Sequence, residues 1–145
     1  MKPEFLWLSE NVELPYLDYS RVEKWIVEVA KTHGFQVRRL SYLFCDDSKI
    51  IEVNRRFLQH DYFTDIITFD DCKGRFLRGD MVISLDTVAS NAHLLGVNPD
   101  EELLRVIIHG VLHLCGINDK GPCEREIMEA YENEALKIFN TEIKY

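Results

Sequence analysis

The sequence lacks the features of membrane, exported and repetitive proteins. No apolar stretch approaches the roughly 20 residues that a membrane-spanning helix requires. The apolar run near the N-terminus is too short for a signal peptide, and no repeat, linker or low-complexity tract is visible. We therefore expect a cytoplasmic protein without a membrane segment.

The chain also lacks Cys-x-x-Cys pairs and an excess of positive charge. Its 4 cysteines are therefore expected to be buried thiols rather than disulfides. The formal net charge of −8 argues against nucleic-acid binding through a basic surface that covers the whole molecule. A local basic patch is compatible with it, because cations gather at Arg38, Arg39, Arg55, Arg56, Lys73, Arg75 and Arg78. The ordinary alternative for each is a solvated surface charge.

The sequence does contain the pattern of an α+β protein. Its 145 residues fit one domain over residues 1–145. Alternating apolar residues predict strands at 5–9, 35–45, 64–69 and 80–85. Helical spacing and end signals, among them a Ser20-x-x-Glu23 capping box and an Asn98-Pro99 start, predict helices at 20–33, 50–58, 85–95, 99–115 and 122–139. We expect a small mixed β-sheet packed with several helices, its strand order left open.

The most informative segment lies at the end of the predicted helix 99–115. His109 and His113 are four residues apart and therefore share one helix face. Gly116 can end the helix and let the chain turn back, which would bring Asp119 to the two imidazoles. Three protein ligands with an open position are typical of a catalytic zinc site. The segment thus predicts one zinc ion (Zn²⁺) on a helix of the zinc-hydrolase type.

Two alternatives stand beside this interpretation. The His-x3-His spacing also occurs by chance, and the stripe of Arg105, His109 and His113 could simply face solvent. Asp119 could also act as a general base instead of a ligand.

Metallopeptidases carry Glu directly after the first histidine, but Gly110 stands there. A glycine inside a helix indicates close packing, either by substrate or by a neighbouring strand.

A general base must therefore come from another segment. Asp61, Asp65 and Asp80 all lie beside predicted strands and are candidates. Of these, Asp65 and Asp80 are the preferred catalytic residues.

Three blocks of this chain resemble the YbeY family of bacterial rRNA maturation endoribonucleases. They are Asn54-x-x-Phe57 with Asp61-x-x-Thr64-Asp65-x-x-Thr68-Phe69, Gly79-Asp80-x-x-Ile83-Ser84, and His109-Gly-x-Leu-His113-Leu-x-Gly116-x-x-Asp119. The resemblance implies a metal-dependent endoribonuclease that is specific for single strands, with zinc held by the signature histidines. It implies substrates in rRNA, notably the 3′ end of small-subunit rRNA, a role in ribosome quality control, and ribosomal partners.

The chain departs from the family pattern at two positions. Asp119 stands where the family has its third histidine, and aspartate is also a competent zinc ligand. Leu58 stands where the family has an arginine, so a phosphate contact must come from elsewhere, with Arg55 and Arg56 as candidates. Two other functions stay open: a zinc peptidase or amidase, and a non-catalytic ribosome assembly factor with a structural metal.

Overall fold

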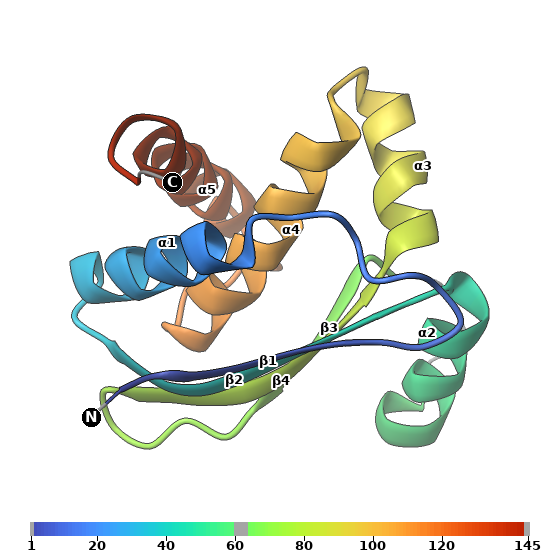
Figure 1. Ribbon diagram of the computed structural model, residues 1–145, viewed down its shortest axis with the longest axis horizontal. Helices are drawn as coiled ribbons and strands as arrows, with labels where there is room; N and C mark the ends of the chain where they lie inside the picture. Colours follow the sequence, from blue (N-terminus) through green and yellow to red (C-terminus); the bar gives the residue numbers. More distant parts are fainter. Residues whose placement is uncertain (1, 60–63, 144–145) are drawn as a thin grey trace.

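The fold is a four-stranded mixed sheet with helices on both faces (Figure 1). The computed structural model describes residues 2–59 and 64–143. The strand order is β1-β2-β4-β3. Strand β2 pairs in parallel with β1 and β4, and β3 pairs antiparallel with β4. The strands are β1 (Glu4–Ser9), β2 (Gln36–Cys45), β3 (Ile66–Asp70) and β4 (Phe76–Ser84).

One face of the sheet carries the larger layer of helices, seen above the strands in Figure 1. These are α1 (Tyr19–Thr32), α3 (Leu85–Leu95), α4 (Pro99–Leu114) and α5 (Glu124–Thr141). The short helix α2 (Asp47–Val53) and the π-helix η1 (Asn54–Leu58) follow β2. In the described residues, no helix has the length and hydrophobicity needed to cross a membrane. The predicted α+β class is confirmed.

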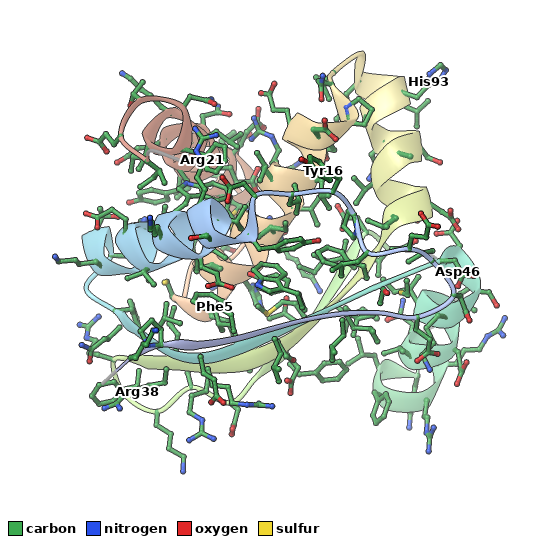
Figure 2. All side chains as sticks on the ribbon, viewed as in Figure 1. Phe5, Tyr16, Arg21, Arg38, Asp46 and His93 are labelled. Carbon is green, nitrogen blue, oxygen red and sulfur yellow. The ribbon has the colours of Figure 1, made fainter. Side chains whose placement is uncertain are left out.

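Alternation along the strands divides the apolar side chains between two cores. Leu40, Tyr42 and Phe44 of β2 join the main core with α1 and α4. Cys45 and the half-buried Leu43 join a smaller core with Ile50 and Val53. Helix α2 therefore packs on the sheet face opposite α4. Leu8 of β1, which pairs with Leu43, is exposed on the rest of that second face, and Arg38 lies below the strands in Figure 2.

The helix ends follow their local signals with one exception. Asn98 caps α4 as predicted, since its Oδ1 accepts from the backbone N–H of Asp100 at 2.8 Å. The capping box at Ser20 is wrong, because α1 is capped by Asp18, whose carboxylate accepts from the N–H of Arg21. Aspartate is as good an N-cap as serine. Glu23, the other half of the predicted box, instead accepts from Trp7 Nε1 at 2.8 Å.

Some element bounds differ from the predicted ones because pairing and packing set them. Strand β4 begins at Phe76, since it pairs with the whole length of β2, whereas a strand from residue 80 was predicted. Helix α5 begins at Glu124 after Cys123, which has a positive φ of 66°. The predicted helix 50–58 begins at Asp47 and changes to a π-helix at Asn54.

The cysteines are free thiols, as predicted, but they are not all buried. Cys45 is buried, Cys72 and Cys115 are partly buried, and Cys123 is exposed. The expectation of burial is wrong for Cys123, because it stands in the turn before α5 rather than on an apolar face.

Gly110 lets α4 lie directly against the sheet. A Cβ at this position would stand 2.9 Å from Ile66 Cδ1 and 3.1 Å from Met81 Cγ. Both distances are shorter than ordinary van der Waals contact. Of the two explanations for this glycine, the contact with a neighbouring strand is the one that the structure shows.

Replacing Gly110 by alanine is expected to destabilise the fold. The change should gain about 1 kcal/mol of helix propensity but cost about 1–3 kcal/mol through overpacking against Ile66 and Met81. Denaturant unfolding should show a net loss. Ala130→Gly, at an exposed position of α5, measures the propensity effect alone. A Gly110→Ala protein more stable than the wild type would contradict the packing argument.

Candidate functional site

The C-terminal turns of α4 open into a pocket of about 290 Å³. His109 and His113 reach it from α4, and Asp119 reaches it from the loop that follows. Its other walls come from η1, from β3 with the residues before it, and from that same loop: Asn54, Leu58, Thr64, Asp65, Ile66, Ile67, Thr68 and Lys120. The structure thus brings the three predicted metal ligands and Asp65 to one pocket.

Gly116 ends α4 and reverses the chain, as predicted. Helix α4 stops at Leu114, and Gly116 takes a φ of 93°, in the left-handed region that glycine adopts without strain. The backbone N–H of Ile117 then bonds to the carbonyl of Leu112 at 3.1 Å. This reversal places Asp119 Oδ2 at 3.3 Å from His109 Nε2.

His109 lies between two carboxylates. Its Nδ1 is 2.6 Å from Oε2 of Glu132, a buried residue of α5. Burial lowers the pKa of His109, but the hydrogen bond and charge of Glu132, with Asp119 and Asp65, outweigh it and raise the pKa above its usual value. The His109 ring is therefore fixed at both nitrogens.

Arg105 completes the polar stripe on α4. Its Nη1 is 3.0 Å from Glu132 Oε1 and its Nη2 is 2.7 Å from Asn133 Oδ1. Arg105, Glu132, His109 and Asp119 also line a second pocket of about 570 Å³ on the other side of His109. The stripe therefore faces α5 and two pockets, so the alternative of a plain solvent-facing stripe does not hold.

Of the two preferred catalytic carboxylates, Asp65 lines the pocket and Asp80 does not. Asp65 directly precedes β3, and burial raises the pKa of its carboxyl, with His109 acting in the opposite direction. Asp80 instead hydrogen-bonds to Ser41 and lies 3.7 Å from Arg39 Nη1. Its neighbour Met81 is the residue that faces α4, so alternation along β4 turns Asp80 to the opposite side of the sheet. Asp61 lies outside the described residues.

The predicted phosphate-binding arginines stand beside the pocket rather than in its wall. Arg55 and Arg56 are exposed on η1, between Asn54 and Leu58, which do line it. The guanidinium of Arg56 lies 5.6 Å from the centre of the Phe57 ring. Within residues 2–59 and 64–143, the cation that lines the pocket is Lys120.

The sequence interpretation missed Glu132 and Lys120. A signal for Glu132 did exist, since it shares the buried stripe of α5 with Met128, Ala135, Leu136 and Phe139. A carboxylate on a buried stripe requires a partner. Lys120 gave no signal apart from following Asp119.

The donor types at the pocket suit zinc. Two imidazoles and one carboxylate form a common catalytic ligand set. Among the residues that the structure describes, however, no three His, Cys, Asp or Glu side chains are grouped closely enough to form a preassembled metal cluster. The pair of His109 and Asp119 is in place, and His113 shares the pocket with them.

A family profile and individual known proteins that match this chain all point to the same family. The family profile described as "Endoribonuclease YbeY" matches residues 9–140. Proteins named "Endoribonuclease YbeY" are 58% identical in Phocaeicola vulgatus, over 91% of this chain and 96% of the relative, and 57% identical in Bacteroides thetaiotaomicron, over 90% and 95%. That of Porphyromonas gingivalis is 50% identical over 93% of this chain and 89% of its own.

A solved structure shows a similar fold. The solution structure of TM1509 from Thermotoga maritima superposes with a TM-score of 0.60, over 94% of this chain and 92% of that one. At 22% identity this likeness supports the fold alone. The family profile and the curated relatives together cover most of the sequence, and the chain belongs to the YbeY family of endoribonucleases.

Proposed function

We propose that this protein is a zinc-dependent endoribonuclease that cleaves single-stranded RNA during rRNA maturation, within one domain over residues 1–145. Family membership supplies the endoribonuclease activity and the role in rRNA processing. The observation that carries the rest is the shared pocket of His109, His113, Asp119 and Asp65. It combines donors for one metal ion with a carboxylate that can take up a proton.

The residues that would hold zinc are His109 through Nε2, His113 and Asp119. When bound, zinc supplies a Lewis acid that can activate water and polarise a phosphoryl oxygen at neutral pH. Asp119 adds a negative charge where a third imidazole would add none. Asp119 is proposed as a ligand because two imidazoles alone would hold a metal weakly.

Asp65 is the proposed general base. It directly precedes β3, and its backbone carbonyl accepts a hydrogen bond from the N–H of Ser84 at 2.9 Å. This bond fixes the chain and turns the carboxylate into the pocket with His109. In that place it can accept a proton from an attacking water or hydroxyl group.

Lys120 is the proposed contact for the phosphate group of the RNA. The wall at Leu58 is apolar, and the acidic residues in the described part of the lining are Asp65 and Asp119. An ammonium group can hold phosphate as a compact point charge. Arg55 and Arg56, one turn away on η1, are proposed to bind the flanking backbone of the same strand.

The glycine at position 110 argues against peptidase activity. In metallopeptidases the corresponding residue is the glutamate that acts as base, but here position 110 is closed off by Ile66 and Met81. A glutamate there would have to displace the side chains of Ile66 and Met81. We further propose cytoplasmic action on ribosomal particles, with ribosomal proteins as partners and a contribution to ribosome quality control.

His113→Ala is expected to abolish activity by removing a metal ligand. Cleavage of a single-stranded RNA and bound zinc should both fall by more than about 100-fold, because even outer-shell partners of a metal contribute 10–100-fold. The control is His93→Ala, since His93 is exposed at the outer end of α3, far from the pocket (Figure 2). Equal cleavage by the His113→Ala and wild-type proteins would disprove the metal-centred mechanism.

Substitutions at Asp119 separate a ligand from a base. If Asp119 is a ligand, Asp119→Ala should lose zinc and cleavage together, and Asp119→His should keep both, because imidazole also binds zinc. Zinc content by atomic emission and RNA cleavage should be measured on the same samples. An Asp119→Ala protein that keeps its zinc but loses cleavage would assign Asp119 the role of a base.

Lys120→Gln is expected to weaken RNA binding without removing zinc. The slope of log affinity against log salt concentration should become shallower by about 0.7, the value for one phosphate contact on a single strand. Fluorescence anisotropy over a salt series measures this slope. Lys24→Gln, at an exposed position of α1, is the matched control, and identical slopes for the two variants would exclude the contact.

A further inference from the structure

Glu132 is a buried carboxylate whose two oxygens serve different partners. The residue is 7% exposed and lies on the inner stripe of α5. Oε2 lies 2.6 Å from Nδ1 of His109, and Oε1 lies 3.0 Å from Nη1 of Arg105. Such a burial is costly unless every oxygen is paired. The position therefore requires an explanation in terms of what Glu132 does for its partners.

We propose that Glu132 is a positioning residue that keeps the hydrogen of His109 on Nδ1 and leaves Nε2 with its lone pair facing the pocket. A neutral imidazole carries one hydrogen, which can sit on either nitrogen. The ring faces a carboxylate at each nitrogen, and the 2.6 Å contact of Nδ1 with Glu132 Oε2 is shorter than the 3.3 Å contact of Nε2 with Asp119 Oδ2, so the hydrogen of the neutral ring belongs on Nδ1. Nε2 then carries the lone pair, on the side of the ring that faces Asp119.

Arg105 holds Glu132 in this orientation. It precedes His109 by four residues on α4, so both side chains meet the same carboxylate from one helix face. Its second nitrogen, Nη2, bonds to Asn133 Oδ1 at 2.7 Å and fixes the plane of the guanidinium group. The guanidinium group of Arg105 thus occupies Oε1 and leaves Oε2 of Glu132 to face the His109 ring.

The inference deepens the proposed function and rests on it for its consequence, which is zinc affinity. A metal ligand whose second nitrogen is bonded to a carboxylate is both oriented and made more basic. The tautomer itself, however, is a property of the metal-free protein and is measured without zinc. The proposed tautomer of His109 and the proposed zinc binding can therefore be disproved independently.

The first measurement is the tautomer of His109 in the metal-free wild-type protein. Long-range ¹H–¹⁵N correlation spectra, assigned with His109→Gln, should show the hydrogen on Nδ1 when the ring is neutral. The hydrogen on Nε2 in the wild type would overturn the inference without the need for any variant of Glu132.

The second measurement compares Glu132→Gln with Glu129→Gln. Glu129 lies one turn earlier on α5 and is exposed, and no bond joins it to His109. Glutamine at 132 keeps the shape but can present an N–H to the ring and release the tautomer. Zinc affinity, measured by competition with a chelating dye, should fall by about 10–100-fold in Glu132→Gln and stay unchanged in Glu129→Gln.

A purely structural role for Glu132 would change the melting temperature alone. Unchanged zinc affinity and tautomer in a folded Glu132→Gln protein would therefore overturn the inference. If the wild-type protein cleaved RNA but bound no zinc, the proposed metal would fail, while the tautomer would still decide the role of Glu132.

Discussion

The close approach of α4 to the sheet at Gly110 is the constraint on which the site depends. Gly110 follows His109, and Ile66, its nearest neighbour across the gap, follows Asp65. The contact that seals the core therefore also sets the distance between the imidazole and the carboxylate. A side chain at position 110 would have to displace the side chains of Ile66 and Met81. Packing and chemistry are fixed here by the same pair of residues.

A second constraint is the balance of charge between α4 and α5. Burying Glu132 alone would be strongly unfavourable, but Arg105 supplies an opposite charge and His109 a hydrogen-bond donor. The ion pair is partly shielded, because the Arg105 side chain is 26% exposed and that of Glu132 10%. Such networks contribute less to stability than to a unique arrangement of their members. In this protein that arrangement orients a ring at the edge of the pocket.

The local parts of the site could be predicted from the sequence, and the long-range parts could not. The face shared by His109 and His113 and the reversal at Gly116 depend on helical spacing and one glycine. The choice between Asp65 and Asp80 depends instead on how β3 and β4 pair, because alternation sends Asp80 away from α4. Glu132 is 23 residues from His109, and the pairing of α5 with α4 is not encoded in any short motif. The strand order and the π-helix could not be predicted either, because no short sequence motif encodes them.

The departure at Asp119 has an electrostatic consequence for the substrate. Among the described residues that line the pocket, Asp65 and Asp119 are acidic, and Lys120 is the one basic lysine or arginine side chain. The whole chain adds to this field with a net charge of −8. A phosphodiester anion would therefore meet more acidic than basic side chains there, and a bound divalent ion would offset them. In a member with three histidines the third ligand would not contribute this negative charge. The proposed zinc ion would thus offset the acidic lining for the RNA backbone as well as support the reaction.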